Sequence, residues 1–485
     1  MALTADVKEE LAAVEITKPA CRKAEVAAML RFAGSLHLVG GKIMVEADLD
    51  TGAAARRLRN TIFDLFGLTC EFVVITPSGL RKSTRYVVRL IRGGDSLARQ
   101  TGLVDARGRP VRGLPAAVVS ATGMRLLTGG AATFDAIAEA VRAARHHVHL
   151  EYYIYEPDQT GTALRDLLIE KARAGVQVRL LVDALGSKKL GRKFLEPLQQ
   201  AGAEVLRFHD AKIGRRLRPV VNFRTHRKIL VCDGKVGFTG GVNVTDEENE
   251  RICDDAYHDV HIRVEGSVVN WLQTVFLEDW AYTRSDDPHR LPNDLDDLLP
   301  DCEDGPIPMQ VVTSGPDDQL DAIYRAYLAA INAAQERVWL TTPYFVPTEA
   351  ALAALTNASL RGVDVQILVP KKSDSALVTG AARSYFDELI RSGVRVYEYE
   401  ARMLHSKTLV VDENIAIIGT ANFDYRSFFL NFEVCLIGYG PELNRHLARQ
   451  FLSDLRQSHQ VSYKSEKGLG RRLFSSAARL CSPLL

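Results

Sequence analysis

Short apolar runs alternate with helix-patterned stretches through most of the chain. Residues 134–145 follow the 3.6-residue period of a helix and lead into an apolar run at 148–155, which is rich in β-branched and aromatic residues. A second helical pattern at 162–174 leads into another apolar run at 176–182. Helices that alternate with short buried strands indicate an α/β domain, with a parallel or mixed sheet covered by helices on both faces.

Three segments of the chain recur later in the same order, which indicates an internal duplication. The recurring pairs are 148–157 with 338–347, 174–182 with 361–369, and 225–233 with 404–412. The offset only decreases along the chain, as loop deletions would produce. We therefore expect two copies of one domain, at 120–302 and 303–485, joined by an acidic, proline-containing linker at 296–308.

Residues 1–119 match neither copy and differ from them in charge. Their pattern predicts a small α+β unit, in which a helix containing three arginines lies between strands at 42–47 and 71–76. This part holds 18 basic and 12 acidic side chains, whereas the whole chain has a formal net charge of only +1. A solvated basic face accounts for this excess, so we consider DNA binding by residues 1–119 possible but disfavoured.

The composition argues against several classes of protein. The 7 cysteines are scattered, with no CxxC spacing and no Cys/His cluster, so we expect neither a disulfide framework nor a metal site, and no cofactor. The first residues lack the pattern of a signal peptide, and no apolar stretch of about 20 residues is present. We therefore expect a cytoplasmic protein whose contact with the cytoplasmic membrane is peripheral.

Each copy carries a His-x-Lys-x4-Asp motif followed by a glycine and an asparagine at identical spacing. The motif residues are His226, Lys228, Asp233, Gly240 and Asn243 in the first copy, and His405, Lys407, Asp412, Gly419 and Asn422 in the second. Residues two apart on a strand share a face, so each histidine and lysine point to the same side. An imidazole can attack phosphorus or donate a proton, while an ammonium and an amide hold phosphate oxygens. Two facing copies would make one phosphoryl-transfer site.

From about residue 122 onward the chain resembles the phospholipase D superfamily, which carries this motif twice, and within it the bacterial cardiolipin synthases. The supporting stretches are 146–154, 222–228, 238–243, 419–428 and 430–433. The resemblance implies two α/β/α sandwich repeats that form a pseudo-twofold, bilobal enzyme. It also implies a metal-free, two-step transfer of a phosphatidyl group through a phosphohistidine.

The resemblance implies a role for each motif residue. His226 and His405 are the reacting pair, and the phosphate is clamped by Lys228, Lys407, Asn243 and Asn422. Two downstream carboxylates, Asp259 and Glu433, orient the imidazoles, while Asp233 and Asp412 support the fold of the motif. The position after the motif glycine, often serine in this superfamily, is Gly241 in one copy and Thr420 in the other. The sequence does not decide which histidine attacks, and we favour His226 by analogy with two-copy relatives.

The leading hypothesis is synthesis of cardiolipin from two phosphatidylglycerol molecules with release of glycerol. Two alternatives stay open: phospholipase D-type hydrolysis or transphosphatidylation of other phospholipids, and a DNA-associated regulatory role of the N-terminal part. The expected partners are anionic phospholipids at a membrane surface. Two segments would suit such contact, although a solvated loop and packing on the core explain them equally well: a loop at 212–228 with five arginines (Arg215, Arg216, Arg218, Arg224 and Arg227), and an amphipathic stretch at 469–485.

The N-terminal part resembles the front domain of the WhiA sporulation regulators, a family related to the LAGLIDADG homing endonucleases. The supporting stretches are 7–11, 21–26, 30–38, 80–86 and 99–110. Alignment to the endonuclease motif puts Val39 where a nuclease needs its metal-binding carboxylate, and His37 where an earlier aspartate stands. A divalent metal would lack its anchor there, so we predict that this part does not cleave DNA.

Overall fold

The computed structural model describes residues 19–39, 42–49, 51–75, 84–101, 103–104, 119–209, 223–284, 295–303, 305–316 and 321–462. These residues form two compact units, which divide between Val118 and Val119. The stretch at 469–485 and most of the arginine-containing loop at 212–228 lie outside the described residues. In the part of the chain that is described, no helix is both long and apolar enough to span a bilayer.

The first unit is a four-stranded antiparallel sheet with helices packed on it, which confirms the predicted α+β architecture. The strand order is β1-β2-β4-β3. The elements are α2 (Pro19–Ala33), β1 (Gly34–Val39), β2 (Lys42–Leu49), α3 (Gly52–Phe66), β3 (Glu71–Ile75), β4 (Arg85–Leu90) and α4 (Gly94–Gln100). The Thr51 side chain caps the start of α3, and Gly67, in the left-handed region, ends it. A separate cluster of buried residues, among them Leu58 and Val88, forms the core of this unit.

The second unit contains two sheets of like topology. The first is seven-stranded, in the order β6-β13-β12-β11-β7-β8-β9. Its strands are β6 (Gly123–Thr128), β7 (His147–Tyr152), β8 (Gln177–Asp183), β9 (Glu204–Phe208), β11 (Lys228–Cys232), β12 (Val236–Gly240) and β13 (Val260–Glu265). Its helices are α5 (Gly130–Ala143), α6 (Gln159–Arg173), α7 (Arg192–Gln200) and α8 (Val268–Arg284). The central strands β7 and β11 are buried along their whole length, and β7 buries His147, His149 and Glu151 together with its apolar side chains.

The second sheet repeats this order with the strands β14-β22-β20-β19-β15-β17-β18, which confirms the duplication. Its strands are β14 (Ile307–Ser314), β15 (Arg337–Thr341), β17 (Asp364–Pro370), β18 (Arg395–Tyr399), β19 (Thr408–Val411), β20 (Ile415–Gly419) and β22 (Asn431–Tyr439), with β23 (Ser458–Gln460) at one edge. Its helices are α10 (Ala322–Ala333), α11 (Glu349–Leu360), α12 (Ala376–Arg391), α13 (Tyr425–Phe429) and α14 (Pro441–Leu455). A separate two-stranded pair is formed by β16 (Phe345–Val346) and β21 (Phe423–Asp424).

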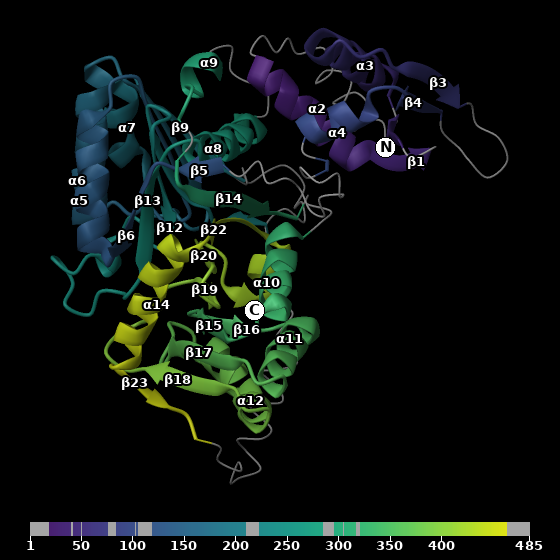
Figure 1. Ribbon diagram of the computed structural model, residues 1–485. Coiled ribbons are helices and arrows are strands. Elements are labelled where there is room, and N and C mark those ends of the chain that lie inside the picture. Colours follow the sequence, from purple (N-terminus) through teal and green to yellow (C-terminus); the bar gives the residue numbers. More distant parts are fainter. Residues whose placement is uncertain are drawn as a thin grey trace. The chain divides into compact units, whose positions relative to one another are not determined.

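Helices cover both faces of each sheet, as the sequence pattern predicts. In the second repeat, α10, α11 and α12 lie on one side of the strands and α14 on the other (Figure 1). In the first repeat, α5, α6 and α7 pack on one face and α8 on the opposite face. One hydrophobic cluster then joins the repeats, because it contains Ile229 and Ile262 from the first sheet together with Val410 and Leu436 from the second.

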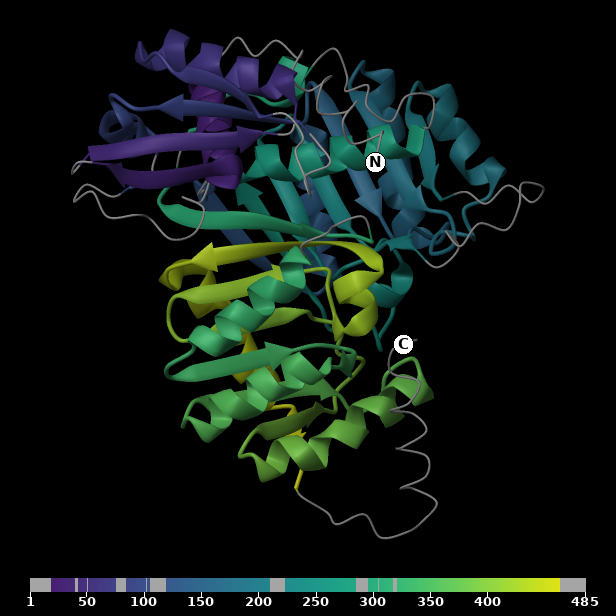
Figure 2. The ribbon, with the colours of Figure 1, turned by 90° about the vertical axis from the view of Figure 1, so that its right-hand side faces the viewer.

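Two short segments that precede or belong to the first repeat are hydrogen-bonded into the second repeat's sheet. Strand β5 (Val119–Ala121) pairs with β14, and β10 (Arg224–Thr225) pairs in parallel with β22. The stacked strands of the two repeats and their connections can be followed in Figure 2. The stretch at 296–308, predicted as a linker, overlaps α9 (Leu295–Leu298), whose Leu298 is fully buried, and it ends in β14. It is therefore partly built into the core.

Candidate active site

The two motif histidines lie at the junction of the repeats, immediately before the central strands β11 and β19. Each is fixed by a backbone hydrogen bond to the other repeat: the His226 amide donates to the carbonyl of Phe432 (2.9 Å), and the His405 amide donates to the carbonyl of His258 (2.8 Å). The next residue after each of these carbonyls is a carboxylate, Glu433 or Asp259. The backbone pairing thus delivers each carboxylate to the histidine of the opposite repeat.

The side chains follow this crossed arrangement. Nδ1 of His226 donates to Oε2 of Glu433 at 2.9 Å, and Nδ1 of His405 donates to Oδ2 of Asp259 at 2.7 Å. Because a carboxylate only accepts, each imidazole carries its proton on Nδ1 and keeps Nε2 as the basic nitrogen. Both rings are therefore held in the tautomer that a nucleophile or a general base requires.

Glu433 is held by hydrogen-bond donors from its own repeat. The hydroxyl of Thr420 donates to Oε2 at 2.5 Å, and the amide of Asn431 donates to Oε1 at 3.2 Å. Burial acts to raise the pKa of Glu433, but His226 and the Lys228 ammonium outweigh it, so the pKa is lowered. Glu433 is thus a fully buried carboxylate that stays ionised.

The corresponding position in the first repeat explains why Thr420 is matched by a glycine. A Cβ on Gly241 would lie 2.2 Å from both carboxylate oxygens of Asp259. The glycine therefore provides the space that the Asp259 carboxylate occupies. Asp259 also has a lowered pKa, because the Lys407 ammonium and the His405 hydrogen bond outweigh the effect of burial.

The two lysines of the motifs are fully buried beside the histidines. Nζ of Lys228 donates to the carbonyl of His226 at 2.8 Å, and Nζ of Lys407 donates to the carbonyl of His405. Burial, and then the charge of Lys407, lower the pKa of Lys228 to about 7. Burial also lowers the pKa of Lys407. Two ammonium groups that are both buried away from solvent in one site favour the binding of an anionic ligand.

Each motif asparagine is anchored by a nearby acid. The Asn243 amide donates to Oε1 of Glu248 at 2.6 Å, and that of Asn422 hydrogen-bonds Asp424. Burial raises the pKa of Asp424 to about 6. The Asn422 Oδ1 atom is buried and has no hydrogen-bond partner among the described residues. The structure thus brings the histidines, lysines and asparagines of both motifs together with Asp259 and Glu433.

The motif aspartates lie away from this cluster and hold the fold. The Asp233 carboxylate accepts backbone N–H bonds from Arg145, His146 and His147 at 2.8 to 2.9 Å. Asp412 accepts the equivalent bonds from residues 335–337. Both aspartates have a positive φ, 55° and 48°, which allows the turn after β11 and β19. They clamp the start of β7 and β15 to these turns.

Two arginines assigned to the surface loop at 212–228 are instead buried, so that part of the prediction was wrong. Arg224 and Arg227 are 7% and 6% exposed. The Arg227 guanidinium pairs with Asp279 and donates to the carbonyls of Glu433 and Ser314. Arg227 therefore supports the segment that carries Glu433 and does not face a membrane.

The sequence argument missed two tyrosines and one acid in the site. The Tyr153 ring lies 4.9 Å from the His226 ring, and the Tyr257 ring lies 5.6 Å from the His405 ring, measured between centroids. Glu248 lies in a run of three acidic residues, and only burial distinguishes it from its neighbours. The sequence offers no signal for that burial.

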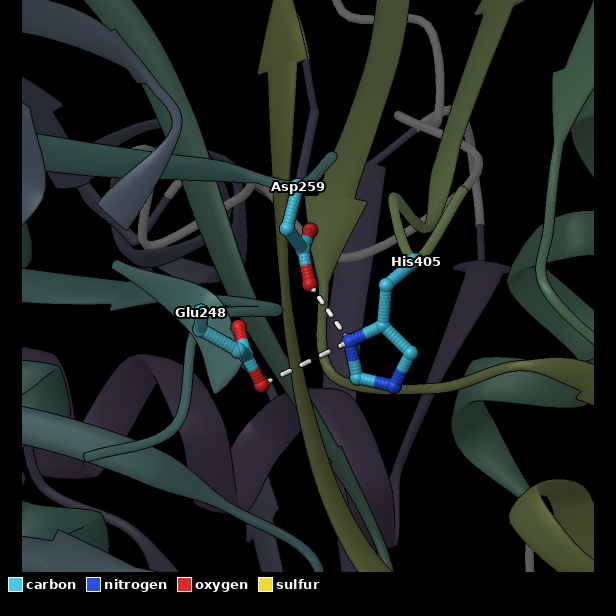
Figure 3. Close-up of side chains that lie close together, drawn as sticks. All are labelled: Glu248, Asp259 and His405. Carbon is cyan, nitrogen blue, oxygen red and sulfur yellow. Dashed lines mark hydrogen bonds and ion pairs between the residues drawn. The ribbon is translucent and has the colours of Figure 1, made fainter. Parts of the chain in front are cut away.

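Glu248, Asp259 and His405 form a group whose potential metal-ligand atoms all lie within 4.8 Å of one another. Both carboxyl groups point to the same ring nitrogen of His405 (Figure 3). The same atoms already serve protein donors, since Asn243 binds Glu248 and the Lys407 ammonium lies 3.5 Å from Asp259. We therefore interpret the group as the polar surroundings of His405, in which Asp259 makes the hydrogen bond that orients the ring.

Two like-folded repeats that each contribute a histidine, a lysine and a carboxylate to one central site define the class of phospholipase D-like proteins. Family comparison agrees: residues 137–280 and 327–455 match the family described as cardiolipin synthase, PLD-like domain, and residues 19–104 match the WhiA N-terminal LAGLIDADG-like domain. The chain belongs to the cardiolipin synthase family.

Individual relatives support this assignment. A cardiolipin synthase of Geobacillus sp. (strain WCH70) is 42% identical over 374 residues, which cover 75% of this chain and 73% of the relative. Cardiolipin synthase 1 of Bacillus anthracis is 41% identical over 373 residues, with the same coverage. The crystal structure of phosphatidylserine synthase from Haemophilus influenzae shares the fold, with a TM-score of 0.59 at 14% identity over 76% of this chain and 97% of that one.

Proposed function

We propose that the protein joins two phosphatidylglycerol molecules into cardiolipin and releases glycerol, through a phosphohistidine on His226. The observation that carries the proposal is the crossed pairing of the two buried histidines with Glu433 and Asp259, which leaves both Nε2 atoms basic in one site. Two such imidazoles supply the nucleophile and the acid–base group that a two-step transfer needs.

In the first step, Nε2 of His226 forms a bond to the phosphorus of one phosphatidylglycerol. The bond from phosphorus to the headgroup glycerol oxygen breaks, and protonated His405 gives its proton to that oxygen, so that glycerol leaves. Burial, and then the Lys407 charge, lower the pKa of His405 to about 4 in the protein alone. A bound phosphodiester anion acts in the opposite direction and favours the protonated ring.

In the second step, a headgroup hydroxyl of another phosphatidylglycerol attacks the same phosphorus. His405, now neutral, takes the hydroxyl proton, and the phosphorus–nitrogen bond to His226 breaks. Cardiolipin is formed and both histidines return to their starting states. Lys228, Lys407, Asn243 and Asn422 bind the phosphate oxygens and stabilise the charge that develops on them in both steps.

A site of this kind also permits hydrolysis, because water differs from the lipid hydroxyl only as an acceptor. The protein would be incubated with phosphatidylglycerol vesicles, and the lipid products would be separated. Cardiolipin and glycerol in equal amounts support the proposal. Phosphatidic acid and glycerol without cardiolipin would show a hydrolase, and the absence of any turnover would refute both.

We propose that the protein works at the surface of the cytoplasmic membrane as a peripheral protein, because its substrates are anionic lipids of a bilayer. A sedimentation assay with phosphatidylglycerol vesicles, compared with neutral vesicles, tests the membrane contact.

We further propose three domains, at 1–119, 120–302 and 303–485. The two catalytic domains would not be independent, since one hydrophobic cluster contains side chains of both.

A further inference from the structure

Glu248 is a third carboxyl group beside the two histidines, and the reaction described above gives it no role. It ends a short 3-10 turn, Asp246–Glu248, that the Thr245 side chain caps. Glu248 is buried, with 1% of the residue exposed, whereas the preceding residue, Glu247, is exposed. The turn therefore directs one of three consecutive acids into the site.

The contacts of Glu248 connect a phosphate-binding group with a histidine. Its Oε1 atom accepts the hydrogen bond from the Asn243 amide at 2.6 Å and lies 3.8 Å from Nδ1 of His405. Its Oε2 atom is buried without a hydrogen-bond partner among the described residues. An amide nitrogen carries two hydrogens, so fixing one on Glu248 fixes the direction of the other.

The second repeat holds its motif asparagine differently, because the side chain of Asn422 hydrogen-bonds the carboxyl group of Asp424. The residue 179 positions later is Ser427, whose hydroxyl accepts the backbone N–H bond of Asn422 at 3.1 Å. His226 thus has one carboxylate at its Nδ1 atom, whereas His405 faces two carboxyl groups. Of the two motif histidines, only His405 has a second carboxyl group near its Nδ1 atom in the part of the chain that is described.

We propose that Glu248 is a positioning residue for phosphatidyl transfer, which aims the Asn243 amide at the phosphate and does so as a neutral acid, leaving Asp259 as the single negative charge at His405. This inference rests on the proposed function for its kinetic part. A second carboxylate at this place would repel the phosphodiester anion, whereas a neutral carboxyl group keeps its acceptor oxygen without adding charge.

The surroundings of Glu248 support the neutral form. Its pKa is raised to about 8 by burial and then by the Asp259 charge, while the pKa of Asp259 is lowered. The other ionisable groups that face it are His405, Lys407 and Lys228 and the phenols of Tyr152 and Tyr257. A bound phosphodiester adds negative charge and raises the pKa of Glu248 further. When the pKa values of two neighbouring carboxyl groups are shifted in opposite directions, one group is charged and the other is neutral at the same pH. Here Asp259 is the charged group and Glu248 the neutral one.

The kinetic test compares Glu248→Gln, Glu248→Ala and Asn243→Ala with the double variant of Glu248→Ala and Asn243→Ala. Glutamine keeps the acceptor oxygen without ionising, so Glu248→Gln should lose no more than about threefold in kcat, and Glu248→Ala about 100-fold with little change in KM. The double variant should be no more than about threefold slower than Asn243→Ala, because both changes remove one interaction. Glu247→Gln is the matched control and should behave as the parent.

Two outcomes would overturn the inference. The first is a folded Glu248→Gln protein that is as slow as Glu248→Ala, since this would mean that the ionised carboxylate is needed. The second is a multiplication of the losses of Glu248→Ala and Asn243→Ala in the double variant. If Glu248→Ala fails to fold in a thermal melt, Glu248→Gln alone decides, and a loss of about 30-fold or more in kcat refutes the proposal.

Infrared difference spectroscopy tests the protonation state without any turnover, and so distinguishes a failure of this inference from a failure of the proposed function. The spectrum of the parent protein minus that of Glu248→Gln at pH 7 should contain the carbonyl absorption of a protonated carboxylic acid. This absorption should disappear as the pH rises through about 8. A difference spectrum that shows only an ionised carboxylate at pH 7 would contradict the neutral acid.

Discussion

Nδ1 of His226 donates a hydrogen bond to Glu433, which lies 207 residues further along the chain and in the other repeat. The same crossed relationship joins His405 to Asp259, 146 residues before it. Neither repeat therefore contains both members of a histidine–carboxylate pair, and each pair forms only when the two repeats are folded together. The repeats also share one hydrophobic cluster.

Glu433→Gln should slow phosphatidyl transfer by about 10²-fold or more, because an amide no longer fixes the imidazole with its proton on Nδ1. Asp259→Asn should have a similar effect through His405. The measurement is kcat for cardiolipin formation from phosphatidylglycerol vesicles, with circular dichroism to confirm folding. Full activity in a folded Glu433→Gln protein would contradict the crossed pairing as a functional arrangement.

Gly241→Ala should inactivate the protein more severely than Thr420→Ala, although both change the same motif position. The new methyl group would lie 2.2 Å from the Asp259 oxygens and displace the carboxylate from His405. Thr420→Ala removes one donor to Glu433 and the acceptor of the Val434 N–H bond, but Glu433 keeps its bond from Asn431. Relative kcat values of the two variants test this, and Thr420→Ser, which keeps the hydroxyl, should stay close to the parent.

Asp233→Asn should lower the free energy of unfolding by about 1–3 kcal/mol, although Asp233 lies outside the site. The reason is that the carboxylate accepts three backbone hydrogen bonds, for which an amide oxygen is a poor replacement. Asparagine tolerates the positive φ, so the backbone is not the cause. Burial acts to raise the pKa of Asp233, but the backbone bonds lower it overall. This stabilisation is present above the unfolded pKa and is lost as the pH falls through the folded value. The melting temperature of Asp233→Asn at neutral pH, against Asp255→Asn as an exposed control, checks this.

The apparent kcat/KM should fall as the pH rises through about 7, where Lys228 loses the charge that binds phosphate. Lys407 contributes to this decrease, because its charge lowers the pKa of Lys228. The corresponding decrease in kcat should occur at higher pH than the decrease in kcat/KM, because the phosphodiester bound in the enzyme–substrate complex raises the pKa of Lys228. Lys228→Arg should remove the contribution of Lys228 to this decrease, at some cost in rate. A kcat/KM that is constant between about pH 6 and about pH 9 would be inconsistent with this.

The sequence predicted much of the fold because the relevant signals are local or repeated. The predicted strands that correspond to β7 and β11 are buried along their whole length, and the equal spacing of both motifs located the histidines, lysines and asparagines. The WhiA-like unit was predicted in the same way. These patterns state which residues are buried and which share a face.

What the sequence could not supply is the pairing of distant segments. Strand β10 joins β22 of the other repeat, and this contact, with the His226 amide bonded to Phe432, is what brings Glu433 to His226. Arg227 looked like a surface residue because its buried partner Asp279 is 52 positions away. Glu248 looked like any acid of an exposed turn. Such contacts depend on how the two sheets pack, which no local pattern encodes.

The central claim is that a phosphatidyl group is held covalently by His226 between the two steps. The most direct measurement is mass spectrometry of the His405→Ala protein, quenched after mixing with a phosphatidyl ester of p-nitrophenol, whose leaving group needs no acid. We predict one phosphatidyl group per chain, located on His226, and no such adduct on the His226→Ala protein. An adduct on His405 of the His226→Ala protein, or cardiolipin formation without any adduct, would contradict the account.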